Sequence, residues 1–149
     1  NLVEAQTLIE RDQLKGNRSG TGMYLSAARS WLFNLVLAER LRRDCWQSPL
    51  DGEIEPSGPL WGRGRSVVTG DLADLEQTVL ANWQSWCYAL EHAGLQQERR
   101  PLILRPQSMA WRRLQSDQLE LSFVLASGCF ATVILREVAE LFRPQFKPL

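Results

Sequence analysis

A short segment rich in glycine and arginine, WGRGR at Trp61 to Arg65, is the first candidate for ligand chemistry in this chain. Its glycines would let the backbone approach a ligand closely, and Arg63 and Arg65 could each bind a phosphate. The indole of Trp61 could stack on a nucleobase. The residue types in this segment are the strongest free-standing indication of RNA binding in the sequence.

A second candidate segment, LSAARSWLFN at Leu25 to Asn34, lies within a predicted helix. Its serines and alanines place small side chains on one helix face and leave Arg29 able to reach a phosphate, with Asn34 about one turn further along. The alternative is close helix packing through the alanines, with Arg29 in a surface ion pair. The residues alone leave both interpretations open.

A third segment, LASGCFATVILRE at Leu125 to Glu137, leads from a predicted strand into a helix. Phe130 lies at the turn between them, where loops commonly present functional groups, and its ring could line a pocket for a base. The alternative is that Phe130 packs the helix onto the sheet. Arg136 could contact such a pocket or form an intrahelical pair with Glu140.

The sequence does not indicate metal or disulfide chemistry. Cys45, Cys87 and Cys129 are odd in number and far apart, which fits neither a disulfide framework nor the ligand spacing of a zinc site. We expect reduced structural thiols. His92 is the only imidazole, and it precedes a glycine that ends a predicted helix, where histidine commonly decorates the helix C-terminus. We therefore predict no metal and no cofactor.

The charge of the chain is balanced, with 17 basic and 17 acidic residues, so no global basic character indicates a nucleic-acid partner. The kind of basic residue is more informative, because only Lys15 and Lys147 are lysine and the others are arginine. A planar guanidinium binds phosphates and stacks on bases, so this bias fits RNA. Codon usage that favours arginine would explain the same bias equally well.

The apolar pattern predicts mostly helices, then a strand hairpin and a closing helix, which makes an α+β chain with a boundary near Leu104. Asp71 is the predicted N-cap of its helix, and residues 47–66 predict a loop because they are rich in proline and glycine. No apolar run approaches the roughly 20 residues of a membrane span, so we expect a soluble, cytoplasmic protein. The predicted helices are 1–14, 23–44, 71–81, 83–93 and 129–142, and the predicted strands are 101–104, 109–114 and 119–125.

Together, the segments Leu25 to Asn34 and Leu125 to Glu137 resemble the TruD family of tRNA pseudouridine synthases. The resemblance implies that residues 1–104 form most of the family's helical insertion domain. It implies that residues 105–149 are the end of the catalytic domain, where a hairpin and a helix complete a mixed or antiparallel sheet. It also implies a jump in the chain near residues 47–51, where the family has a compact strand-containing segment. We expect this chain to be the back half of an enzyme.

The activity implied by this resemblance is the isomerisation of uridine to pseudouridine at the D-arm position of tRNA conventionally numbered thirteen. RNA would lie in the cleft between the two domains, with Phe130 in the uridine pocket, without a cofactor or a metal. We expect a monomer with no membrane association. The RNA-binding candidates are Arg29, Asn34, Trp61, Arg63, Arg65, Arg105 and Arg136. Further arginines that would extend a basic lining, or simply be solvated, are Arg99, Arg100, Arg112 and Arg113.

The family's aspartate nucleophile belongs to a Gly-x-Lys-Asp motif that these residues do not contain, so no catalytic nucleophile is assigned and we expect the 149 residues alone to be inactive. A non-catalytic RNA-binding fragment or degenerate paralogue is the alternative, and it would lack that motif throughout its gene. A helical protein–protein module whose tryptophans form an interface is a further alternative. Such a module would show no salt-sensitive RNA binding.

Overall fold

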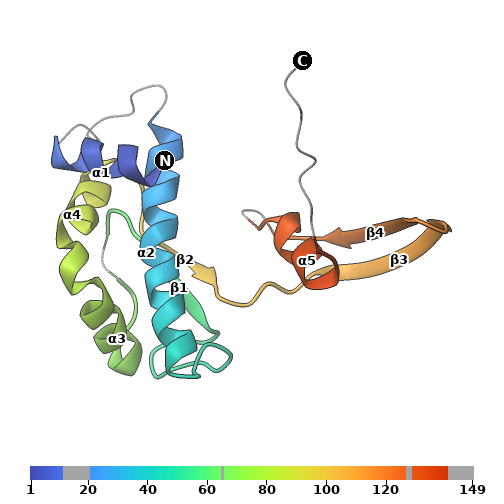
Figure 1. Ribbon diagram of the computed structural model, residues 1–149. Helices are drawn as coiled ribbons and strands as arrows, with labels where there is room; N and C mark the ends of the chain where they lie inside the picture. The colour runs from blue at the N-terminus through green and yellow to red at the C-terminus, as the bar shows by residue number, and fades with distance from the viewer. Residues whose placement is uncertain (12–20, 65, 127–128, 141–149) are drawn as a thin grey trace, which may run out of the picture. The chain divides into compact units, whose positions relative to one another are not determined.

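The computed structural model describes residues 1–11, 21–64, 66–126 and 129–140. The chain divides into two compact units, Asn1–Ile103 and Leu104–Leu149. Helices and two small antiparallel sheets, in which β1 pairs with β2 and β3 pairs with β4, make the chain α+β, which confirms the predicted class (Figure 1). The assignment of the two units to an insertion domain and a catalytic domain stays a prediction.

The first unit is mostly helical. Helix α1 (Leu2–Glu10) contacts both α2 (Gly22–Arg42) and α4 (Gln84–His92), and α3 (Gly70–Leu80) packs along α2. A 3-10 turn, Ala81–Trp83, joins α3 to α4. Figure 1 shows α3 and α4 running one after the other beside α2, with α1 across one end. The predicted long helix over 23–44 is therefore confirmed, with its ends shifted by one or two residues.

The core of this unit is built on the apolar stripe of α2. Ala28, Leu32 and Val36 are fully buried at four-residue spacing, and Leu90 of α4 is fully buried among the same cluster. Burying one such leucine contributes roughly 1.5–3 kcal/mol. The stripe explains why α2 forms along its whole length, because helical spacing is what brings these side chains onto one face.

Tryptophans fill the space between α2 and α4. The ring of Trp83 meets those of Trp31 and Trp86 edge to face, at centroid distances of 5.6 and 5.1 Å. The Nε1 of Trp86 donates to Gln6 Oε1 of α1 at 2.8 Å. Edge-to-face pairs of this kind add about 0.5–1.5 kcal/mol beyond the burial of their area. These tryptophans therefore hold α1, α2 and α4 together.

The small sheet of the first unit differs from the prediction. Strands β1 (Ser57–Leu60) and β2 (Glu98–Pro101) pair in antiparallel register, and β1 packs against α2. The loop predicted over 47–66 and the strand predicted over 101–104 were both wrong in this respect. β1 carries glycine and proline, so its strand conformation comes from its partner and from α2 rather than from its own propensity.

A buried ion pair organises the segment between α2 and β1. Arg40 is fully buried and pairs with Glu53, whose side chain is 3% exposed. The Nη2 of Arg40 also donates to the carbonyls of Cys45 and Ser48, at 2.8 and 2.7 Å. One guanidinium thus fixes the fold of the segment in which we expect a jump relative to the family, near residues 47–51; that jump stays a prediction.

A second, partly buried ion pair joins α3 to the sheet. Arg99 of β2 contacts Glu76 of α3 at 2.7 Å and donates to Ser57 Oγ of β1 at 2.8 Å. Ser57 in turn donates its N–H to Glu53 at 3.3 Å, which links the two pairs. Burial raises the pKa of Glu76, and the Arg99 guanidinium partly offsets that rise. Both pairs lock the sheet to the helices that flank it.

Helix α3 begins earlier than predicted. Thr69 is its N-cap and makes no side-chain capping bond, whereas Asp71, the predicted cap, lies in the first turn. At this position the negative charge of Asp71 interacts favourably with the positive end of the helix dipole. Gly70 has φ 60°, and a Cβ at this position would lie 2.1 Å from Asp51 Oδ2. The close approach of Asp51 thus requires glycine at the start of the helix.

The second unit is a hairpin followed by a helix. Strands β3 (Gln107–Gln115) and β4 (Gln118–Val124) pair with Trp111 opposite Leu121, which confirms the predicted hairpin. Helix α5 (Ala131–Val138) was predicted over 129–142 but ends earlier, because Ala139 is extended. Among the residues described after position 103, Ile134 alone is buried.

Over the described ranges, none of the helices combines the length and the apolarity that crossing a membrane requires.

Cys87 is buried in the core of the first unit, and this burial raises the pKa of its thiol to about 12. A thiol held in its neutral form is a poor nucleophile, so Cys87 is a packing residue, as the sequence predicted.

Candidate nucleic-acid interface

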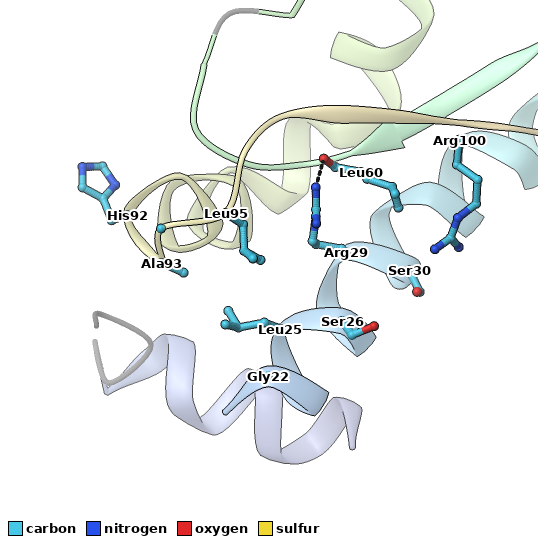
Figure 2. A pocket seen from close by; sticks show the side chains of 11 residues that line it. Gly22, Leu25, Ser26, Arg29, Ser30, Leu60, His92, Ala93, Leu95 and Arg100 are labelled. Carbon is cyan, nitrogen blue, oxygen red and sulfur yellow. Dashed lines mark hydrogen bonds between the residues drawn. The ribbon is translucent and has the colours of Figure 1, made fainter. Parts of the chain in front are cut away.

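An open groove of about 410 Å³ lies in the first unit, between the N-terminal half of α2 and the turn that joins α4 to β2 (Figure 2). It holds the larger part of the LSAARS segment. The lining residues of α2 are Gly22, Leu25, Ser26, Arg29 and Ser30. The other lining residues are Leu60 of β1, the turn residues His92, Ala93, Gly94 and Leu95, and Arg100 of β2.

Local rules place these side chains together. Ser26, Arg29 and Ser30 lie three and four residues apart, so they share one face of α2. Gly94 has φ 83° and follows the end of α4, as predicted from sequence, because a residue with a Cβ is strained in that conformation. The chain therefore turns after α4, and the turn lines the groove opposite Ser26, Arg29 and Ser30 of α2.

Arg29 is anchored inside the groove wall. Its Nη2 donates to the carbonyl of Leu60 at 2.8 Å (Figure 2). The same Nη2 donates to the carbonyl of Gln96 at 2.7 Å and lies 3.4 Å from Glu98 Oε2. Its Nε is buried and has no hydrogen-bond partner among the described residues. Burial lowers the pKa of Arg29, Glu98 opposes that effect, and the charge of Arg100 adds to it. Arg29 therefore uses its Nη2 hydrogen bonds to hold α2 to β1 and to the α4–β2 turn.

Arg100 is held differently from its neighbour Arg99. Side chains alternate along a strand, so Arg99 enters the buried pair with Glu76 while Arg100 lines the groove. The Arg100 guanidinium lies 5.3 Å from the ring centroid of Phe33, and it forms no ion pair with any residue that the structure describes. Of the two arginines that line the groove, Arg100 is therefore the one without a carboxylate partner among the described residues.

The WGRGR segment lies beside the same turn, but two of its residues face inward. The Nε1 of Trp61 donates to Glu91 at 3.0 Å, and the ring packs against the core. A Cβ on Gly62 would lie 2.5 Å from the Gln96 carbonyl oxygen, so the absence of a side chain at Gly62 lets the backbone of Gln96 approach. Internal packing therefore accounts for Trp61, which was predicted to stack on a base, and for Gly62, which was predicted to let the backbone approach a ligand.

Arg63 has an exposed side chain, and its backbone N–H donates to the Leu95 carbonyl at 2.6 Å. It lines a second hollow of about 470 Å³ that shares His92 and Gly94 with the groove. The structure thus brings Arg63 and Arg29 to the same α4–β2 turn. Arg65 lies outside the described residues.

The remaining candidates lie elsewhere. Asn34 is exposed on α2 but is not among the residues that line the groove. Arg105, Phe130 and Arg136 belong to the second unit and are all exposed, with Phe130 as the residue preceding α5 and 66% exposed. His92 ends α4, and its Nδ1 lies 2.8 Å from the Tyr88 carbonyl, in keeping with the predicted decoration of a helix end.

Sequence reasoning gave no signal for the contacts that shape the groove. The carbonyls of Leu60 and Gln96 that bind Arg29 are backbone groups of residues 31 and 67 positions away, so their role depends on the fold. The opposite environments of Arg99 and Arg100 could have been predicted from sequence, because neighbouring side chains of a strand point to opposite faces. The strand itself, however, had been predicted three residues too late.

Comparison with known proteins agrees with this chemistry. The family model of tRNA pseudouridine synthase D (TruD) matches residues 47–138, which include the Leu125 to Glu137 segment and exclude Leu25 to Asn34. The tRNA pseudouridine synthase D of Cellvibrio japonicus is 46% identical over 149 aligned residues, which cover 99% of this chain and 44% of that protein. This α+β chain is therefore similar to a protein named tRNA pseudouridine synthase D.

Two further relatives carry the same name. That of Shewanella oneidensis is 38% identical over 167 residues, covering 94% of this chain and 45% of the relative. That of Aeromonas hydrophila is 37% identical over 168 residues, covering 94% and 47%. Because this chain has 149 residues, the two longer alignments include positions without a counterpart here. The chain belongs to the TruD family of tRNA pseudouridine synthases, and it spans less than half the length of these relatives.

Proposed function

We propose that the protein to which this chain belongs isomerises uridine to pseudouridine in tRNA, at the D-arm position numbered thirteen, and that this chain supplies RNA contacts and part of the base pocket. The family match over residues 47–138 carries the proposal. The substrate class follows from the names of the relatives, each of which is a tRNA pseudouridine synthase D. The position within tRNA follows from the resemblance of the two segments to the family.

The reaction breaks the bond between C1′ of the ribose and N1 of uracil and forms a bond from C1′ to C5. N1 gains a proton and C5 loses one, so atoms and electrons balance without an oxidant, a reductant or a cofactor. The base must leave its stack and be held while it turns. This demands an aromatic or apolar surface against the base and an aspartate nucleophile, and the family's nucleophile motif does not occur in these residues.

We assign the aromatic surface to Phe130. Its side chain is 66% exposed immediately before α5, with extended backbone, so its ring is available to a base. The alternative, that Phe130 packs α5 onto the β3–β4 hairpin, predicts a ring that is buried within this unit. Arg136 on α5 and Arg105 before β3 are exposed as well and are proposed to contact the RNA.

We propose that the two units are the family's insertion domain, residues 1–104, and the end of its catalytic domain, residues 105–149. Two observations support this. The chain divides into compact units at Ile103, and the second unit leaves large apolar side chains such as Trp111 exposed, as expected for part of a larger sheet. A monomeric, cytoplasmic enzyme without metal or cofactor completes the proposal.

The test is a tritium-release assay with tRNA that carries tritium at C5 of uridine, because the isomerisation sends the C5 hydrogen to solvent. We expect the full-length protein to release tritium and Phe130→Ala to reduce the rate about 100-fold, the scale that follows from misplacing a reacting group. Val138→Ala, at a residue also exposed on α5, is the control and keeps the rate. A full-length protein that binds tRNA without releasing tritium would favour the non-catalytic alternative.

A further inference from the structure

We propose that the Arg100 side of the groove is a subsite for a backbone phosphate of RNA, with Arg100 as the charged contact and the hydroxyls of Ser26 and Ser30 as further donors. The proposal rests on the proposed RNA-binding function and names the residues and the chemical group involved. It differs from the sequence prediction, which emphasised Arg63 and Arg65 of the WGRGR segment.

The charge of the groove favours an anion. Among the described residues that line it, Arg29 and Arg100 are cationic and none is a carboxylate. The carboxylate of Glu98 lies 3.4 Å from Arg29, and its side chain is 60% exposed. The charge of Arg100 lowers the pKa of Arg29, in the direction expected for repulsion between the two guanidinium groups. A bound phosphate would relieve that repulsion.

Arg100 is also oriented in advance. Its guanidinium lies over the ring of Phe33, which is 6% exposed, and Gly58 makes room for that ring, since a Cβ there would lie 2.8 Å from it. An arginine stacked on an aromatic face keeps its N–H edge free for a bidentate contact to phosphate. Arg99 next to it shows the opposite case, with its Nη2 and Nε engaged by Glu76 and Ser57.

The form of the groove selects a phosphate over a base. The Phe33 ring is covered by Arg100 and the core, so it offers no face on which a base could stack. Within the described residues the rim is open, because a Cβ on Gly22 or on Gly94 would meet none of their atoms within 4 Å. A polynucleotide backbone can therefore approach along the rim. Arg29 acts as a positioning residue, because its bonds to Leu60 and Gln96 hold the groove's walls together.

The experiment measures binding of a fluorescently labelled, unmodified tRNA transcript to the full-length protein that contains this chain, from roughly 50 to 200 mM salt. We expect Arg100→Gln to weaken binding about ten-fold, the loss of one hydrogen bond to a charged group. The slope of log affinity against log salt should shrink by about 0.7–0.9, which is one phosphate contact. Ser26→Ala combined with Ser30→Ala should weaken binding without changing the slope, because hydroxyls carry no charge.

The matched control is Arg42→Gln, which removes a cation from the far end of α2, where the side chain is 70% exposed and pairs with Glu39. It should keep affinity and slope. If the full-length wild-type protein binds tRNA and Arg100→Gln binds it with unchanged affinity and slope, the subsite is wrong and the proposed function stands. If the full-length wild-type protein shows no salt-sensitive binding, the RNA function itself is overturned.

Two further arms separate remaining explanations. If Arg100→Gln lowers the unfolding midpoint in urea, the double serine variant decides, because the Ser26 and Ser30 hydroxyls form no hydrogen bond with another residue that the structure describes. Unchanged affinity in that variant overturns the subsite. Inorganic phosphate is the second probe. If it raises the thermal midpoint of the wild-type chain while tRNA does not bind, the groove takes free anions and its assignment to RNA is wrong.

Discussion

Two tryptophans summarise the difference between the units of this chain. Trp86 of the first unit is 5% exposed and donates to Gln6, whereas Trp111 of the second unit is 72% exposed. Both lie in elements that the apolar pattern predicted. The first unit can bury its apolar side chains because the apolar faces of several helices pack against one another. A hairpin and one short helix have too little surface to cover each other. Apolar patterning therefore specifies an element but not what covers it.

The largest expected effect tests the buried ion pairs of the first unit against an exposed pair of the second. Arg40→Met leaves the Glu53 carboxylate buried without its partner, so it should lower the free energy of unfolding by about 3–5 kcal/mol. Arg112→Met removes an arginine whose pair with Glu120 is exposed, at 69% and 45%, and should cost about 0–1 kcal/mol. Urea denaturation followed by far-ultraviolet circular dichroism measures both. Equal losses would show that the units do not differ in this respect.

A leucine pair sharpens the same comparison. Leu32 is fully buried and Leu119 is 54% exposed. Leu32→Ala should cost about 2–5 kcal/mol, since it removes transfer free energy and leaves a cavity, whereas Leu119→Ala should stay within about 0.5 kcal/mol as a surface change. The same denaturation series provides the measurement. A large loss in Leu119→Ala would mean that this face is covered in solution, which would contradict its exposure in the structure.

The smallest expected effect concerns pH within the first unit. Hydrogen bonds from Arg42 and Arg43 lower the pKa of Glu39 to about 2. Its stabilising contribution is therefore present above about pH 4.5 and is lost as pH falls towards 2. Burial raises the pKa of Glu76, so the stability linked to its titration falls as pH rises above 4.5. Unfolding midpoints against pH for Glu39→Gln and wild type should converge in acid; a constant gap would contradict this assignment.

Much of the fold was accessible from sequence because its signals are local. The stripe of Ala28, Leu32 and Val36 predicts α2, and the alternation of leucines with polar residues predicts β4. Helix α3 and the hairpin were also found near their predicted places. The strand pair β1–β2 was not found, because a segment such as Ser57–Leu60 has no alternation of its own and becomes a strand only against Glu98–Pro101.

The candidate site divides in the same way. The sequence by itself determined the family, through two segments at Leu25 to Asn34 and Leu125 to Glu137, and it determined which face of α2 carries Ser26, Arg29 and Ser30, because helical periodicity is a local property. It did not determine what those side chains face. Only the tertiary structure bound Arg29 to the Leu60 and Gln96 carbonyls and left Arg100 without an ion pair among the described residues, because those environments depend on which distant segments the fold brings together.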